Sequence, residues 1–393
     1  MTLMEKTHYS AWAEVDLRAI RHNYRELKKV VNLRTIEGPS QKRPLLRKGR
    51  SPGLLTVIKA DAYGHGMLKI ASTLDNLGVS FFGVSDVTEG VTLRKNGFKN
   101  AILLFESTLP SCAKEVVEYN LTPTVCTRTL ASSLNTYAKA LSRKADIHIK
   151  IDTGMGRLGI WYPEAYPFIR QIAKYDHLSI KGLYTHFPVA DTDKNYTKNQ
   201  IDQLYDLVKK LDNEAVIIPY VHAANSMGLV GYKSHILNLS RPGLMLYGLY
   251  PANFLKKRIK LDPAMSVKAK VIFVKKVIKG RGISYGHTFV AERDMMVATL
   301  PIGYSNGYMR CLSNKSHVLI QGKRCPVIGN VTMDQIMIDV SRLKNVKIGS
   351  EAVILGGQQK EMITADELAR HANTINYEIV CSLGNLLPRV YLH

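Results

Sequence analysis

Residues 54–66 read LLTVIKADAYGHG and join an apolar run at 54–58 to Lys59 and a glycine-containing turn. Short apolar and β-branched runs of this kind are typical of strands that are buried on both faces. Similar runs recur at 80–84, 101–105, 121–125, 146–151, 180–185, 218–222 and 237–240. Together with the first, they give eight candidate strands in about 250 residues.

Amphipathic segments separate these runs, with apolar residues at helical spacing at 66–77, 128–142 and 195–211. Asp16 is a candidate N-cap for a further helix at 17–31. Strands that alternate with helices predict parallel pairing and right-handed crossovers. Eight such units match the size of a closed (β/α)8 barrel. We therefore predict an α/β chain with an N-terminal TIM-like barrel domain at 8–250.

The sequence pattern changes after about Pro251. Strand-like runs at 265–279, 294–300, 317–320, 323–328, 335–340 and 351–355 are separated by turn residues. This pattern predicts a mostly antiparallel C-terminal β domain at 251–393. One helix is expected to interrupt it, because Thr364 and Glu367 form a capping-box pattern. Segment 37–53 is an irregular insertion.

Composition excludes several classes of protein. The chain has 393 residues and is 46% hydrophobic, which is too apolar for a disordered chain. No stretch approaches the ~18 consecutive apolar residues of a membrane helix, and residues 1–6 lack a secretion signal. We therefore expect a cytoplasmic protein. The 5 cysteines form no CxxC pair, so we expect neither a disulfide framework nor a metal site.

The net charge is +22, from 54 basic and 32 acidic residues. Much of it gathers in two clusters: Lys42, Arg43, Arg47, Lys48 and Arg50, then Lys256, Lys257, Arg258 and Lys260. The first cluster lies among prolines and glycines and has no aromatic residue on which a base could stack. We interpret it as a solvated loop that attracts small anions, and we expect no nucleic-acid partner.

Residues 154–159 satisfy the GxGxxG pattern of dinucleotide-binding folds, but the context differs. In those folds a helix opens within the glycine turn, whereas here Ile160, Trp161 and Tyr162 intervene before Pro163. We predict that the glycines let the chain turn sharply after the strand and direct Arg157 inward.

Polar side chains follow several of the predicted strands at the point where each strand ends. They are Lys59, Arg157, His186, Asn225, Ser226 and Arg241. The carboxyl ends of parallel barrel strands lie on one face, where barrel enzymes have their active sites. An amine at such a desolvated strand end is a good nucleophile toward a carbonyl group. The sequence therefore predicts an active site on this face.

Ordered motifs over nearly the whole chain resemble those of the alanine racemases, which are pyridoxal-phosphate (PLP) enzymes. The matching stretches are IKADAYGHG at 58–66, KIDTGMGRLG at 150–159, YTHF at 184–187, HAANS at 222–226, RPG at 241–243, SYGHT at 284–288, VTMDQ at 331–335 and TINYE at 374–378. The resemblance implies racemisation between L-alanine and D-alanine, which supplies D-alanine for peptidoglycan.

By this resemblance, Lys59 would bind PLP covalently and serve as one catalytic base, and Tyr285 would be the second. Racemisation removes a proton from one face of Cα and returns it on the other, so two bases on opposite faces suit it. A tyrosine has a reference pKa of about 10 and needs a neighbour that stabilises its phenolate. The family implies His186 in this role, hydrogen-bonded to Arg241.

The resemblance also assigns the cofactor contacts. Arg241 would face the pyridine nitrogen, and because arginine does not readily release a proton, that nitrogen would stay unprotonated and favour return of the proton to Cα. The phosphate would be held by Tyr63, Ser226, Gly243, Leu244 and Tyr377, with Asn225 in the same cleft.

Three further assignments concern the substrate side. Arg157 would contact the substrate carboxylate, and Lys150 would orient it if carbamylated; an unmodified Lys150 paired with an acid is the alternative. Met333 and Tyr285 would come from the partner subunit, so that the active site requires a homodimer. Asn330 and Thr332 depart from the arginine and cysteine common in the family and leave the breadth of substrate open.

Three other functions fit part of this pattern. A racemase of wider range would also accept serine, a PLP-dependent barrel decarboxylase would release carbon dioxide, and a non-enzymatic PLP-binding barrel protein would lack the β domain that carries Tyr285. Rates on alanine and serine would separate the first of these from an alanine-specific enzyme.

Overall fold

A computed structural model describes residues 8–36, 53–232, 234 and 236–393. The basic cluster at 42–50 and almost all of the 37–53 insertion lie outside the described residues. Contacts divide the chain into two units, each formed from discontinuous segments. The first contains residues 1–20, 61–70 and 262–393, and the second contains 21–60 and 71–261. This grouping differs from the linear division predicted at 8–250 and 251–393, and each unit is described by itself below.

The second unit is built on eight parallel strands, one in each region where the sequence predicts one. They are β2 (Gly53–Val57), β3 (Phe81–Val84), β4 (Ala101–Ser107), β5 (Thr122–Val125), β6 (Ala145–Asp152), β8 (Leu178–Tyr184), β9 (Tyr220–His222) and β10 (Leu239–Ser240). They pair in the order β10-β2-β3-β4-β5-β6-β8-β9. The short strand β7 (Ile160–Trp161) pairs with β6.

Asn238 closes this sheet into a barrel, just before β10. Its backbone N–H donates to the Val221 carbonyl (3.0 Å), and its side-chain carbonyl accepts from the Val221 N–H (2.9 Å). The Arg241 N–H then donates to the Ala224 carbonyl (2.9 Å). These hydrogen bonds join the region of β9 to that of β10, the two ends of the strand order, and the predicted (β/α)8 fold is confirmed.

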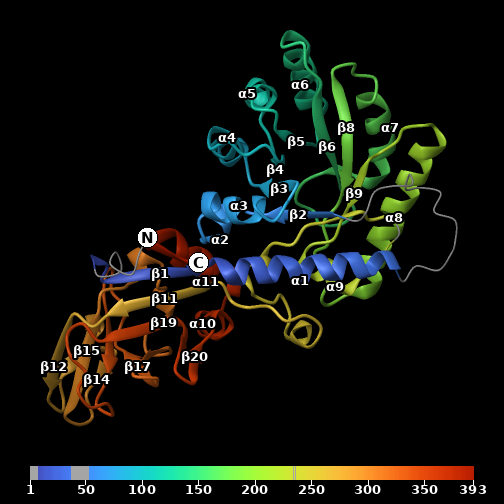
Figure 1. Ribbon diagram of the computed structural model, residues 1–393. Coiled ribbons are helices and arrows are strands. Elements are labelled where there is room, and N and C mark those ends of the chain that lie inside the picture. Colours follow the sequence, from blue (N-terminus) through green and yellow to red (C-terminus); the bar gives the residue numbers. More distant parts are fainter. Residues whose placement is uncertain (1–7, 37–52, 233, 235) are drawn as a thin grey trace. The chain divides into compact units, whose positions relative to one another are not determined.

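Helices lie around these strands (Figure 1). They are α3 (Met67–Asp75), α4 (Val87–Lys95), α5 (Ala113–Glu118), α6 (Arg128–Ala140), α7 (Tyr162–Ile172), α8 (Lys194–Asn213) and α9 (Ser226–Gly231). Asp86, Thr127, Asp193 and Asn225 cap α4, α6, α8 and α9 by accepting backbone N–H groups. The predicted N-cap Asp16 accepts from the Arg18 and Ala19 N–H groups at the start of α1 (Leu17–Ile36).

The first unit has a second sheet, mostly antiparallel, in the order β12-β15-β18-β17-β16-β19-β11-β1-β21. Its strands are β1 (Ala11–Asp16), β11 (Met265–Lys270), β12 (Phe273–Val277), β15 (Met295–Leu300), β16 (His317–Ile320), β17 (Lys323–Ile328), β18 (Ile336–Asp339), β19 (Glu351–Gln358), β20 (Glu361–Ile363) and β21 (Arg389–Leu392). The N-terminal strand β1 pairs with β11 and β21, so residues 11–16 belong to this sheet and not to the barrel.

Two helices accompany the second sheet, whereas the sequence predicted one. The predicted helix is α10 (Ala365–Ala372), and Thr364 accepts the Glu367 N–H at its start. The additional helix is α11 (Asn376–Leu386), which has no side-chain cap. A cap is the strongest local signal for a helix start, and its absence explains why α11 was missed. The predicted run at 265–279 is likewise divided, into β11 and β12.

The turn that follows β2 is left-handed. Ala60, Asp61, Ala62 and Tyr63, within α2 (Lys59–Tyr63), have φ angles of 53°, 50°, 56° and 54°, a conformation that costs L-residues about 1–2 kcal/mol each. Its Asp61 carboxylate accepts from the Met67 N–H (2.6 Å) and from the Arg389 guanidinium. These bonds hold the strained turn in place.

No helix in the described ranges is long and apolar enough to cross a membrane. All five cysteines are free thiols.

Candidate active site

Charged and polar side chains meet at the carboxyl ends of the barrel strands. Lys59 lies just beyond β2, after Ile58, and Arg157 follows β6, His186 follows β8 and Arg241 follows β10. Burial and, in decreasing order, the positive charges of Arg241, Lys150, Arg157 and Lys59 together lower the pKa of His186 to about 2. Four basic side chains therefore act on one imidazole.

Arg241 is the most constrained of these cations. It is 4% exposed, and its Nη2 donates to the Thr185 and Ala223 carbonyls (2.9 Å each) and to His186 Nδ1 (3.2 Å). Its Nη1 donates to His222 Nδ1 (2.8 Å). The hydrogen bond expected between Arg241 and His186 is therefore present. Within the described part of the chain, the Arg241 Nε–H has no protein acceptor and stays available to a ligand.

A histidine pair extends this network into the barrel. His222 Nε2 lies 2.9 Å from His148 Nδ1. Because arginine can only donate, His222 accepts at Nδ1 and must donate from Nε2. His148 then accepts at Nδ1 and carries its proton on Nε2, which is buried without a partner. Burial and the charge of Arg241 lower the pKa of His148 to about 3 and lower that of His222. Both rings are neutral.

The sequence reasoning gave no role to His222 or His148. His222 ends β9, and His148 lies in the middle of the apolar run of β6. A polar ring within an otherwise buried strand is the signal that could have identified them. Gly182 on β8 makes room for this pair, since a Cβ there would lie 2.5 Å from the His148 ring.

Tyr184 supports the same cluster from β8. Its ring stacks on His222 at a centroid distance of 4.7 Å and an angle of 3°. The Lys150 ammonium and the Arg241 guanidinium lie 5.4 Å and 5.3 Å from the ring centroid, so both cations have cation–π contacts with it. The Tyr184 hydroxyl is 2.6 Å from Thr124 Oγ1.

Lys150 is buried and forms no ion pair with the described residues. Asp152, the nearest acid along the strand, accepts instead from the N–H groups of Gly154, Met155 and Gly156. Burial and the charges of Arg241 and Arg157 lower the pKa of Lys150 to about 8. A minor fraction of this amine is therefore neutral near physiological pH, and the charge of Asp152 raises the pKa of Lys150 slightly against these effects.

The glycine-containing loop at 154–159 turns sharply after β6. Gly154, Gly156 and Gly159 have φ angles of 129°, 69° and 129°. The strand β7 and the helix α7 follow the loop, and no helix opens within the glycines. Arg157 is exposed at its tip and has no acceptor among the described residues. Its guanidinium is therefore available to an anionic ligand.

Ser226, Gly243 and Leu244 lie together at the ends of β9 and β10. The Gly243 N–H donates to Ser226 Oγ (3.3 Å), and Leu244 begins the 3-10 turn η3 (Leu244–Tyr247). Asn225 accepts the Gly228 N–H (2.9 Å) as the cap of α9. These hydroxyl and backbone N–H groups are the donors that a phosphate binds.

The remaining predicted residues belong to the first unit, where they form two groups. Tyr63 and Tyr377 are neighbours, with ring centroids 6.1 Å apart. Tyr285 is at the turn between β13 (Gly282–Ile283) and β14 (Phe289–Val290), and its side chain is 75% exposed. Met333 is 55% exposed. Neither Tyr285 nor Met333 is buried in the core of its own unit.

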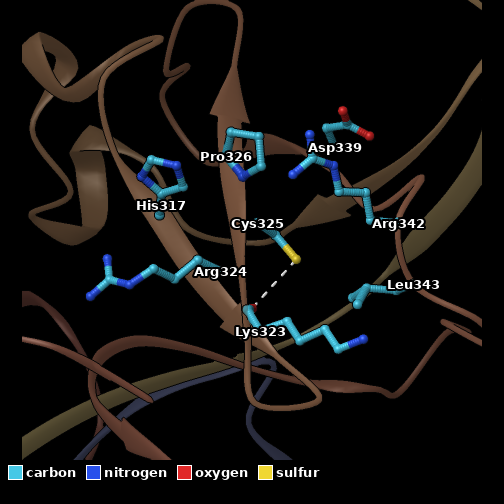
Figure 2. A pocket seen from close by; sticks show the side chains of 8 residues that line it. All are labelled: His317, Lys323, Arg324, Cys325, Pro326, Asp339, Arg342 and Leu343. Atoms are coloured by element: carbon cyan, nitrogen blue, oxygen red, sulfur yellow. Dashed lines mark hydrogen bonds between the residues drawn. The ribbon is translucent and has the colours of Figure 1, made fainter.

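A cavity of about 490 Å³ lies in the same unit, between β17 and the segment 339–343 (Figure 2). It is lined by His317, Lys323, Arg324, Cys325, Pro326, Asp339, Arg342 and Leu343. None of these was predicted as a site residue. Arg324 forms ion pairs with Glu361 and Glu367, and the Cys325 thiol contacts the Lys323 carbonyl. The part of the chain that the structure covers has no cluster of three His, Cys, Asp or Glu side chains able to hold a metal ion.

Comparisons with known proteins agree with this geometry. Residues 44–251 match the family model for the alanine racemase N-terminal domain, and residues 264–391 match that for its C-terminal domain. An alanine racemase of Carboxydothermus hydrogenoformans is 40% identical over 383 residues, which cover 97% of this chain and 99% of that one.

Two solved structures are similar over nearly their full length. The alanine racemase of Clostridium difficile 630 has a TM-score of 0.87 and 33% identity, covering 98% of this chain and 96% of that one. The enzyme of Bacillus anthracis with bound L-Ala-P has a TM-score of 0.86 and 31% identity, covering 98% and 96%. The chain belongs to the alanine racemase family.

Proposed function

We propose that this protein interconverts L-alanine and D-alanine with PLP bound at the carboxyl ends of the barrel strands, and that it supplies D-alanine for peptidoglycan in the cytoplasm. The main support is the cluster of cations around His186, in which Arg241 has no acidic partner. The relatives named alanine racemase, one of them with bound L-Ala-P, agree with alanine as substrate.

The residues at the barrel mouth fit PLP. Lys59 offers a primary amine for the cofactor's aldehyde, and Ser226, Gly243 and Leu244 offer donors for its phosphate, to which Tyr63 and Tyr377 would add hydroxyls. When bound, PLP supplies an electron-withdrawing ring that acidifies the Cα–H bond of the attached amino acid. The Arg241 Nε–H can donate to the pyridine nitrogen without protonating it.

His186 would orient the second base. Its Nδ1 accepts from Arg241, so its proton is on Nε2. The very low pKa keeps the ring neutral, and His186 therefore acts as a fixed hydrogen-bond donor. A donor of this kind stabilises a phenolate, which is the form in which Tyr285 removes a proton. Lys59 would act on the opposite face of Cα.

The exposure of Tyr285 and Met333 supports a shared active site. Large exposed side chains are often used at an interface with another chain. We infer a homodimer in which the partner's Tyr285 faces Lys59 and the partner's Met333 borders the substrate.

Lys150 is proposed to be carbamylated. Its neutral amine would attack carbon dioxide, forming an N–C bond and releasing one proton, which leaves a carbamate anion on Nζ. The lowered pKa and the neighbouring Arg241 and Arg157 favour this anion. A carbamate would pair with Arg157 and orient it toward the substrate carboxylate.

The test is chiral analysis of alanine incubated with the purified protein and added PLP. Conversion of either enantiomer into an equal mixture is the expected result, and no conversion refutes the proposal. Parallel incubations with L-serine and D-serine measure the breadth of the substrate range.

A further inference from the structure

The turn that carries Tyr285 is strained. Ser284, Gly286 and His287 have φ angles of 65°, 70° and 43°, so two non-glycine residues adopt the left-handed region. Such residues persist only where the surrounding structure fixes them. Because the Tyr285 side chain is 75% exposed, its own packing holds the turn weakly. The groups that hold the backbone therefore determine where the phenol points.

Asn330 holds this backbone through two reciprocal hydrogen bonds. Its side-chain Nδ2 donates to the Tyr285 carbonyl (2.7 Å), and its own backbone carbonyl accepts from Ser284 Oγ (2.6 Å). One residue thus holds both Tyr285, through its carbonyl, and Ser284, through its side chain.

Asn314 provides a second anchor on the other side of the turn. Its Nδ2 donates to Thr288 Oγ1 (3.0 Å), and its Oδ1 accepts from the Gly329 N–H (2.6 Å). Gly329 has a φ angle of 72°, and a Cβ there would lie 2.6 Å from the Ile283 carbonyl oxygen. Segment 329–330 and turn 284–288 can therefore approach this closely only with glycine at 329.

The loop that carries Asn330 also carries Met333. Asn330 therefore connects the two residues predicted to face the partner subunit, Tyr285 and Met333. The Met333 carbonyl accepts from the N–H and the Oγ of Ser305, at 2.9 Å each. The Thr332 N–H and Oγ1 both donate to the Gln335 carbonyl. The loop is thus fixed at both ends, and a rigid loop can serve as the support for Tyr285.

We propose that Asn330 is the positioning residue for Tyr285, with Asn314 as its second anchor. This proposal rests on the proposed function, because it assumes that Tyr285 exchanges a proton with the substrate. In this role Asn330 acts through Tyr285, by fixing the direction in which the phenol leaves the turn.

The test compares Asn330→Asp with the wild-type holoenzyme. The substitution keeps the shape of the side chain but replaces the N–H donor by an oxygen that faces the Tyr285 carbonyl. We expect kcat/KM to fall about tenfold or more, since a misplaced catalytic group lowers rates steeply. Ser284→Ala removes the reciprocal bond and should act in the same direction. Asn345→Asp, at an exposed position in the same unit, is the matched control and should stay within twofold of wild type.

The distinguishing readout is the kinetic isotope effect with α-deuterated alanine. If Asn330 positions Tyr285, the isotope effect rises for the one enantiomer whose proton Tyr285 removes, while the covalent PLP content stays unchanged. A rise that is equal for both enantiomers, or a loss of activity that only follows a loss of bound PLP, would overturn the proposal.

Hydrogen exchange separates this proposal from the proposed function. The amides of 284–288 should exchange about tenfold faster in Asn330→Asp than in Asn345→Asp, whether or not the protein racemises alanine. Unchanged exchange overturns the proposal that Asn330 holds the turn. If the two variants differ in this way but the wild-type protein does not racemise alanine, the proposed function is refuted instead, and with it the role of Asn330 in catalysis.

Discussion

Arg241 Nη1 lies 2.8 Å from His222 Nδ1, and this contact determines which nitrogens of His222 and His148 carry the proton, while Arg241 Nη2 does the same for His186. Since the guanidinium only donates, every imidazole in line with it must accept on the facing nitrogen. His186 is thereby left with a proton on the nitrogen that faces away from Arg241. A buried arginine thus fixes the tautomers of His222, His148 and His186 without any carboxylate.

Replacing His148 tests this network. In His148→Phe, the buried Nε2–H of His222 loses its acceptor, which costs about 1–3 kcal/mol of the free energy of unfolding. We expect kcat to fall while the covalent PLP content is retained. Chemical denaturation together with steady-state assays checks both. His177→Phe, at a partly exposed histidine near the surface of the same unit, is the control; equal effects of the two substitutions would contradict the account.

The buried neutral histidines predict acid lability. The pKa values of His148 and His186 are lowered to about 3 and about 2, whereas a histidine in the unfolded chain titrates near 6.5. The unfolded state therefore binds more protons below pH 6.5, and the stability that is complete above this pH is lost as the pH falls toward 3. Each histidine contributes up to about 1.4 kcal/mol per pH unit in that window.

Urea unfolding between pH 7 and pH 4 measures this slope. In His148→Gln, the slope of the unfolding free energy against pH should be smaller than in wild type by the contribution of one histidine. A variant with an unchanged slope would show that His148 is not the group responsible.

Lys150 predicts a second pH dependence of the free energy of unfolding, at higher pH. Its folded pKa is about 8 against a reference of 10.5, so the unfolded state binds more protons between these values and stability rises with pH across that window. Unfolding between pH 8 and pH 10 in carbon dioxide-free buffer, for wild type and Lys150→Met, should show a steeper rise of stability with pH for wild type. Carbon-13 NMR with labelled bicarbonate should show one carbamate signal that Lys150→Met lacks.

Two glycines allow the stability cost of a left-handed backbone to be measured separately from the cost of close packing. Gly64 has a φ angle of 81°, and a Cβ there would lie 2.6 Å from the Val380 carbonyl oxygen; Gly78 has a φ angle of 74° and open space around it. Gly78→Ala should cost about 1 kcal/mol for the left-handed conformation alone. Gly64→Ala should cost about 1–3 kcal/mol more, since backbone has to move. Thermal denaturation of the pair checks this, and equal losses would contradict it.

The barrel could be predicted from the sequence because its strands are short apolar runs, and the site could be predicted because polar side chains follow the ends of these runs. Lys59, Arg157, His186 and Arg241 were found in this way. His148 was missed because it lies within β6, where a polar residue is ordinarily a packing group, and His222 was missed because it is the last residue of β9 and does not follow the strand. The helix α11 was missed because it lacks a capping side chain, and the placement of β1 in the second sheet depends on pairing with residues about 250 or more positions away. Local sequence carries no signal of that kind.

The most direct test of the central claim is to reduce the PLP-loaded protein with borohydride and map the labelled peptide, for wild type and Lys59→Ala. The account predicts that the cofactor is attached to Lys59, and that Lys59→Ala carries no adduct and has lost at least about a thousandfold in racemisation rate. Lys174→Ala, at an exposed position, should label and react as wild type. An adduct on any other lysine, or a Lys59→Ala protein that racemises alanine at the wild-type rate, would contradict the account.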